Sequence, residues 1–110
     1  MMTIFDIIAD PTRRQILDLL LQRPHTVNEL VGAVEISQPG ISKQLRILRE
    51  AGLVDVQQEA QMRWYELRPE PLQEIDKWLS AYRQMWSSRY ERLDEYLKQV
   101  QEEDKHHGDE

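Results

Sequence analysis

The sequence predicts a mostly α-helical fold with one small β-hairpin. Three observations carry this prediction: apolar residues recur every three or four positions in most segments, they alternate in one segment near the middle, and prolines and capping residues separate the segments. The chain has 110 residues, 40% of them hydrophobic, which is enough for one core and too little for two. We therefore predict a single domain over residues 1–103 and a disordered polar tail over residues 104–110.

Two helices are predicted at the start of the chain. Residues 2–9 form a short amphipathic helix, and Asp10 and Pro11 then supply an N-cap and a proline in the first turn of a second helix. This second helix ends before Pro24. The expected apolar faces are Ile4, Phe5 and Ile8 in the first helix and Ile16, Leu17, Leu20 and Leu21 in the second.

Two capped helices joined by a short turn follow. Thr26 and Glu29 have the spacing of a capping box, in which each side chain accepts a hydrogen bond from the other residue's backbone N–H. Ser37 caps the next helix, and Gly52 stands where a left-handed C-cap residue belongs. The residues expected to face inward are Leu30 and Val34 in the first helix of the pair and Ile41, Leu45 and Leu48 in the second.

The alternating segment predicts a two-stranded hairpin. Residues 53–59 and 62–67 form its strands and Ala60–Gln61 its turn. If the hairpin is purely structural, Trp64 and Leu67 cap the core. A helix pair followed at once by a hairpin is the winged helix-turn-helix plan.

A long last helix begins near Pro71 and extends to about residue 102. At 1.5 Å per residue it would span roughly 45 Å, more than the roughly 30 Å of so small a domain. Its apolar stripe would therefore form a partner surface, most simply with a second copy of the chain. The residues expected in this interface are Leu79, Tyr82, Trp86, Tyr90, Leu93 and Leu97. A pocket for a small molecule lined by these aromatic residues and a docking groove for another protein are the alternatives.

The helix that follows Ser37 is the candidate for reading DNA. In a helix-turn-helix the second helix lies in the major groove, with its N-terminal residues at the base edges. With its apolar residues inward, the opposite face presents side chains that can bind bases and phosphates. The predicted DNA-binding residues are Ser37, Gln38, Pro39, Ser42, Lys43 and Arg46, joined by Gln61 and Arg63 near the hairpin tip. A solvated helix face and a purely structural hairpin are the alternatives.

The net charge of −6 argues at first against a nucleic-acid partner. Its distribution matters more than the sum. Residues 10–68 hold eight basic and eight acidic side chains, whereas residues 69–110 hold six basic and eleven acidic ones. The acidity therefore belongs to the last helix and the tail, and the DNA-binding hypothesis stands.

Several kinds of site are excluded by residue type. The chain has no cysteine, so it has no disulfide, thiolate metal site or thiol sensor. It has no glycine-rich phosphate loop, no nucleophile beside a base and no metal-ligand cluster, so we expect neither an enzyme nor a cofactor. Without a run of 18 apolar residues or a signal peptide, we expect no membrane association and a cytoplasmic location.

Several segments together resemble the ArsR/SmtB family of bacterial repressors. They are ADPTRRQIL at 9–17, VNEL at 27–30, SQPGISKQLRIL at 37–48 and REAGLV at 49–54. The resemblance covers about residues 3–97. It implies a homodimer joined through the first and last helices, with Ile4, Phe5 and Ile8 contributing from the first. It also implies repression through a double-stranded palindromic operator, often the protein's own.

The resemblance also indicates what this chain lacks. Metal-sensing members carry cysteines in the third helix, where this chain has Val31 and Ala33, and others carry histidines in the last helix, where residues 72–100 have none. We therefore expect no metal, and control by concentration, by a protein partner or by an unidentified effector. The role of Arg13 and Arg14 is left open, because they could hold helix ends or contact DNA. A winged-helix module for protein interaction is the second functional hypothesis.

Overall fold

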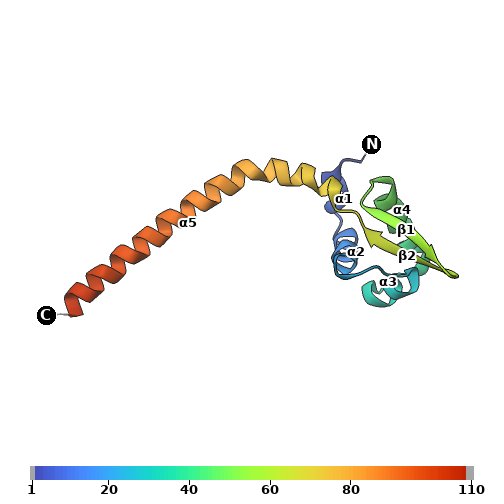
Figure 1. Ribbon diagram of the computed structural model, residues 1–110, viewed down its shortest axis with the longest axis horizontal. Coiled ribbons are helices and arrows are strands. Elements are labelled where there is room, and N and C mark those ends of the chain that lie inside the picture. Colours follow the sequence, from blue (N-terminus) through green and yellow to red (C-terminus); the bar gives the residue numbers. More distant parts are fainter. Residues whose placement is uncertain (1, 109–110) are drawn as a thin grey trace. The chain divides into compact units, whose positions relative to one another are not determined.

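The computed structural model describes the backbone of residues 2–108 and the side chains of residues 2–103 (Figure 1). It divides into two compact units, residues 1–75 and 76–110, which are described separately. The elements are α1 (Ile4–Ile8), α2 (Pro11–Gln22), α3 (Val27–Val34), α4 (Gln38–Glu50), β1 (Val54–Glu59), β2 (Met62–Leu67), η1 (Glu70–Leu72) and α5 (Gln73–Gly108). The predicted fold, mostly helical with one antiparallel hairpin, is confirmed.

Side-chain caps fix where the helices begin. The Asp10 carboxylate accepts a hydrogen bond of 2.9 Å from the Thr12 N–H, and the Ser37 hydroxyl accepts one of 3.3 Å from the Gly40 N–H. The capping box of Thr26 and Glu29 is formed as predicted. A second capping box, which the sequence reading overlooked, joins Thr3 to Asp6 and starts α1. Local chemistry thus sets these boundaries.

The core of the first unit lies where the helices and the hairpin meet. Its buried residues are Ile4, Ile7, Ile16, Leu17, Leu20, Leu30, Ile41, Leu45, Leu48, Leu53, Val54 and Tyr65. One expectation for the first two helices was wrong, because Leu21, assigned to the apolar stripe of α2, is 73% exposed. In α1, Ile4 and Ile7 are buried in the core, whereas Phe5 is exposed and Ile8 is half-buried. In helices this short, small rotations decide which flank of an apolar stripe is covered.

The hairpin pairs Val54 with Leu67 and Glu59 with Met62 around the turn at Ala60, whose φ is 57°. Tyr65 is the buried aromatic residue of β2, whereas Trp64 is half-buried. A third segment pairs with this strand, because His25 forms an isolated bridge with Tyr65 through two backbone hydrogen bonds of 2.8 and 3.0 Å.

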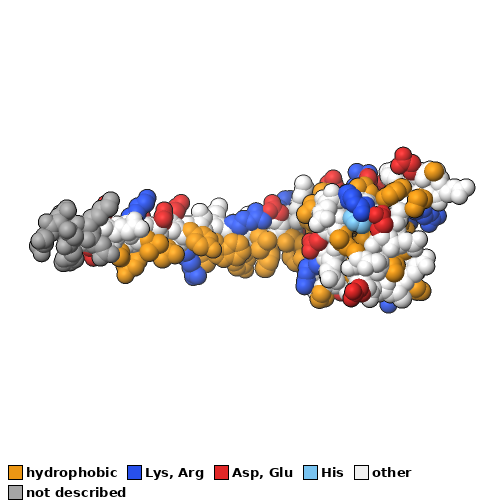
Figure 2. All heavy atoms as spheres, turned by 90° about the horizontal axis from the view of Figure 1, so that it is seen from below, with side chains coloured by type: hydrophobic (Ala, Val, Ile, Leu, Met, Phe, Trp, Pro, Cys, Tyr) orange, Lys and Arg blue, Asp and Glu red, His pale blue; other side chains and the backbone are white. Residues whose placement is uncertain are grey.

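The long helix α5 keeps its apolar side chains on one side, as Figure 2 shows along its length. Its backbone is helical as far as Gly108, whereas the sequence predicted a tail from residue 104; residues 109 and 110 lie outside the described part. No proline and no earlier glycine interrupts this helix. None of the described helices is long and apolar enough to cross a membrane.

Candidate nucleic-acid interface

Helix α4 separates an apolar face from a polar one. Ile41, Leu45 and Leu48 are each at most 1% exposed and hold the helix against the core. The predicted DNA-binding residues on the other face are all exposed: Ser37, Gln38, Pro39, Ser42, Lys43 and Arg46. Because the helix is anchored by its apolar face, these side chains are free to meet a ligand surface.

A hollow of about 220 Å³ lies between the start of α4 and the hairpin tip. Gln38 from α4 and Gln61 and Arg63 from the hairpin line it together, so the structure brings these three predicted residues to one place. Asn28, in the first turn of α3, lines the same hollow and was missed by the sequence reading. Only tertiary structure could have indicated it, because Asn28 is ten positions from the nearest of the other three in the sequence.

A second hollow of about 480 Å³ runs beside the middle of α4. It gathers Ser42 and Arg46, both predicted, with Arg49, which was not. Arg49 follows Arg46 by three positions, a helical spacing that could have pointed to it. Glu50, also at this hollow, is the one acidic side chain of α4.

The basic residues of the segment 10–68 fall into two groups. Four are engaged with carbonyl or carboxylate oxygens: Arg13, Arg14, Arg23 and Arg68. The other four form no ion pair within the part of the chain whose side chains are described: Lys43, Arg46, Arg49 and Arg63. All four lie on α4 or the hairpin. Positive charge available to phosphates is therefore concentrated on these two elements, although the segment as a whole is neutral.

Two carboxylates beside these elements are held in ion pairs. A side-chain hydrogen bond of 2.7 Å from Arg23, together with the Thr26 N–H, lowers the pKa of Glu29 from its ordinary value of 4.5 to about 2. Arg68 likewise holds the pKa of Asp55 below its usual range. Both acids are paired with a neighbouring arginine, which limits their repulsion of an anionic ligand.

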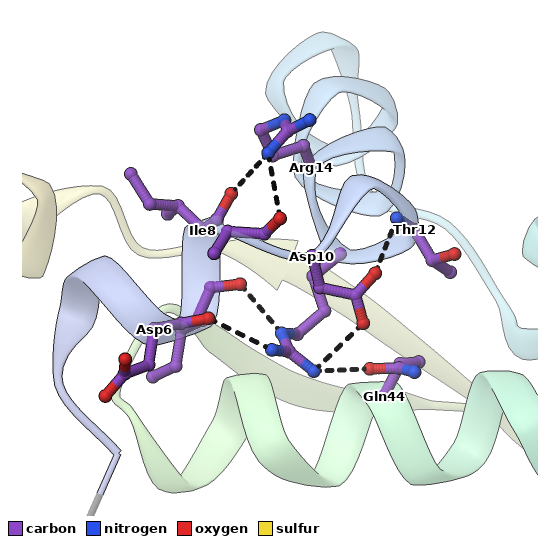
Figure 3. Close-up of polar contacts among 9 residues, drawn as sticks. Asp6, Ile8, Asp10, Thr12, Arg14 and Gln44 are labelled. Atoms are coloured by element: carbon purple, nitrogen blue, oxygen red, sulfur yellow. Dashed lines mark hydrogen bonds and ion pairs between the residues drawn. The ribbon is translucent and has the colours of Figure 1, made fainter.

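The two arginines whose roles were open both bind main-chain oxygens at the end of α1. Arg13 is 7% exposed and bonds to main-chain oxygens of α1, while the Arg14 guanidinium donates to the carbonyls of Ile8 and Ala9 at 2.7 and 3.2 Å (Figure 3). Both thus stabilise the end of α1, whose last carbonyls have no partner within so short a helix.

No group of three potential ligands for a metal ion occurs among the described residues. In the second unit, a shallow groove of about 640 Å³ runs along one side of α5. Trp86, Tyr90, Leu93 and Leu97 line it, and all four are exposed. These are four of the six residues of α5 that the sequence predicted for a partner surface. Of the remaining two, Tyr82 is exposed and Leu79 half-buried.

Comparisons with known proteins agree with this geometry. Residues 10–56 match the family described as bacterial regulatory protein, arsR family. The chain is 37% identical over 79 residues to the transcriptional repressor SdpR of Bacillus subtilis, covering 72% of this chain and 88% of that protein. It is 42% identical over 60 residues to a biofilm growth-associated repressor of Agrobacterium fabrum, of which it spans about half, 51%. That match covers 54% of this chain.

Solved structures show the same likeness. The crystal structure of an ArsR family transcriptional regulator superposes with a TM-score of 0.64 and 30% identity, covering 76% of this chain and 87% of the other. Reduced HlyU from Vibrio cholerae superposes with a TM-score of 0.58 and 35% identity, covering 71% of this chain and 83% of the other. Proteins with related sequences therefore share the winged helix-turn-helix architecture that the sequence predicts.

Proposed function

The chain belongs to the ArsR family of bacterial DNA-binding transcriptional regulators, which are not enzymes, and we propose that it represses transcription by binding a palindromic operator as a homodimer. One observation carries this proposal. Within the segment 10–68, the four basic side chains that form no ion pair in the described part of the chain all lie on α4 and the hairpin. Such a cluster is the electrostatic footprint of a phosphate-binding surface.

In this proposal α4 lies in the major groove. Gln38, at its exposed first turn, has the amide that pairs with adenine, and Arg46 has the guanidinium that pairs with guanine or phosphate. Ser42 and Lys43 contact the backbone or adjacent bases.

The hairpin acts as the wing beside this helix. Gln61 and Arg63 share a hollow with Gln38, so a duplex that meets the start of α4 also reaches the hairpin tip. There Arg63 binds a flanking phosphate or enters the minor groove. The DNA-binding surface then extends from α4 onto β2.

The homodimer would form through α5 and α1. Large apolar side chains of α5 are exposed in a row along the helix, and a contiguous apolar surface of this kind marks an interaction site. Phe5 and Ile8 would add to the interface from α1, whereas Ile4 is buried in the core of its own unit and contributes little. A two-fold axis would place the two α4 helices about one helical turn of DNA apart, ~34 Å.

A gel-shift assay with the chain's own promoter region tests this function. We expect retardation at low salt, where phosphate contacts are strongest, and competition by unlabelled promoter DNA but not by a scrambled duplex. A complete absence of retardation at low salt would contradict the DNA-binding role. It would favour the second hypothesis, a winged-helix module for protein interaction.

The regulatory signal is proposed to be neither a metal nor a thiol reagent. The chain has no cysteine, and the described residues hold no ligand cluster for a metal ion. Control would come from concentration, a protein partner or an unidentified effector. As a regulator of transcription it would act in the cytoplasm, where the DNA is.

A further inference from the structure

One buried cation connects three helices of the first unit. The Arg13 side chain, in the first turn of α2, donates from Nε to the Ile7 carbonyl at 2.8 Å and from one terminal nitrogen to the Asp6 carbonyl at 3.2 Å. The other terminal nitrogen donates to Gln44 Oε1 of α4 at 3.1 Å and pairs with Asp10 at 3.2 Å (Figure 3). α1, α2 and α4 thus meet at a single guanidinium.

This arrangement is costly unless it is complete. A buried guanidinium loses its hydration, and only a full set of acceptors offsets that loss. Here four oxygens surround the planar group, and no buried side-chain polar atom of the described residues lacks a partner. Because the fork of guanidinium donors is rigid, the positions of its acceptors are fixed relative to one another.

Gln44 is the acceptor that lies on the helix proposed to read DNA. It is half-buried and projects toward the same side as Ile41 and Leu48, while its sequence neighbour Lys43 is exposed. The apolar residues of α4 anchor the helix, but apolar contacts have little directionality. The hydrogen bond to Gln44 is directional, and it constrains the rotation of α4 about its own axis.

We propose that Arg13 is a positioning residue for DNA recognition, which through Gln44 fixes the rotation of α4 relative to α1 and α2. The inference rests on the proposed DNA-binding function. Without the hydrogen bond between Arg13 and Gln44, α4 would stay folded but would present Ser42, Lys43 and Arg46 at a shifted angle. Base contacts depend on that angle, whereas attraction to phosphates depends on it weakly. The contact with Gln44 therefore governs selectivity for the operator more than affinity for DNA in general.

Three variants separate this role from simple stabilisation. Gln44→Leu keeps the size of the side chain and removes the acceptor, and Gln44→Glu keeps the acceptor. Arg14→Ala is the matched control, because Arg14 also binds carbonyls at the end of α1 but forms no hydrogen bond or ion pair with α4 within the described part of the chain. Arg13→Ala is avoided as the main variant, since it removes all four contacts at once and endangers folding.

The first measurement is the ratio of affinities for the operator and a scrambled duplex. We expect Gln44→Leu to lower this ratio about tenfold, the loss of roughly one good base contact. Gln44→Glu should keep the wild-type ratio, because it keeps the acceptor for Arg13 and its added charge weakens binding to both duplexes alike. Arg14→Ala should leave the ratio unchanged. A wild-type ratio in Gln44→Leu, or an equal loss in Arg14→Ala, overturns the proposal.

The second measurement needs no DNA. Amide hydrogen exchange should accelerate in α4 as well as α1 for Gln44→Leu, and in α1 alone for Arg14→Ala. Unchanged exchange across α4 in Gln44→Leu overturns the positioning role. If the wild-type protein itself does not distinguish its operator from scrambled DNA, the proposed function fails, and the exchange result still decides whether Arg13 holds α4.

Discussion

At the scale of single residues, the C-terminal ends of α3 and α4 differ in backbone strain. Gly52 ends α4 with a φ of 77°, a conformation that glycine adopts without strain. Glu35 ends α3 with a φ of 59°, which costs any residue with a Cβ atom about 1 kcal/mol or more. The sequence predicted the first of these ends and gave no sign of the second.

Replacing Glu35 with glycine is therefore expected to stabilise the protein. The free energy of unfolding, measured with urea, should rise by about 0.5–1 kcal/mol, because the left-handed conformation is no longer strained. The matched change Gly52→Ala should lower it by about 1 kcal/mol. A Cβ atom there would lie 3.7 Å from the Pro71 ring, an ordinary contact, so that loss would come from the backbone alone. A destabilising Glu35→Gly would contradict this account of α3.

The ion pair at the start of α3 predicts a dependence of stability on pH. Because the pKa of Glu29 is about 2 in the folded chain against an ordinary 4.5, its contribution is fully present above about pH 4.5 and is lost as the pH falls toward 2. The gap in unfolding free energy between wild type and Glu29→Gln should narrow over that range. Arg23→Gln should weaken the same dependence. A gap that is constant between pH 6 and pH 3 would exclude this role of Glu29.

At the scale of elements, α4 joins a fixed apolar face to a face of exposed polar and basic side chains. The same helix carries Leu45, 1% exposed, and Lys43, exposed, two positions apart. This division follows from the helical period alone, so the sequence was sufficient to predict it. How strongly the exposed face attracts phosphates then depends on which Lys and Arg side chains are already held in ion pairs.

Lys43→Ala should weaken binding to all DNA sequences by a similar factor. Since one phosphate contact is lost, the slope of log affinity against log salt should become shallower by about one. Arg68→Ala is the control, because Arg68 is held by Asp55 and Glu66 and its loss should leave the slope unchanged. An unaltered slope in Lys43→Ala would remove Lys43 from the phosphate-binding surface.

The hairpin shows where prediction from periodicity ends. Alternation requires Trp64 and Tyr65 to point to opposite faces, but it does not say which face meets the helices. The packing of the hairpin against the helices decides this, with Tyr65 buried and Trp64 half-buried. The backbone bridge between His25 and Tyr65 likewise had no signal in the local sequence.

At the scale of the whole molecule, the exposed apolar side of α5 is the surface proposed to bind a second copy of the chain. Trp86 and Leu93 are 45% and 53% exposed in the single chain. The acidity of the C-terminal third then belongs to the helix proposed for dimerisation, and the basic side chains without ion pairs belong to the elements proposed for DNA. This separation explains how a chain of net charge −6 can bind a polyanion.

Trp86→Asp or Leu93→Asp should therefore produce monomers in sedimentation experiments, because a charge would be buried in the interface without a partner. Operator affinity should fall in consequence, since only one half-site is bound at a time. Ser88→Asp is the matched control, because it adds the same charge on the opposite side of α5. A dimer that survives both stripe variants would assign this stripe to another partner.

The sequence by itself was sufficient to predict the helices, the caps at Asp10, Thr26, Ser37 and Gly52, the hairpin and the candidate DNA-binding face, because each depends on residues close together in the chain. Thr26 with Glu29, Ser37 with Gly40, and the steps from Ile41 to Leu48 are of this kind. Only the tertiary structure decided how α4 is held. Arg13 meets Gln44 across 31 positions, and His25, which precedes α3, meets Tyr65 of β2. Contacts between distant segments depend on the packing of whole elements, which no local pattern encodes.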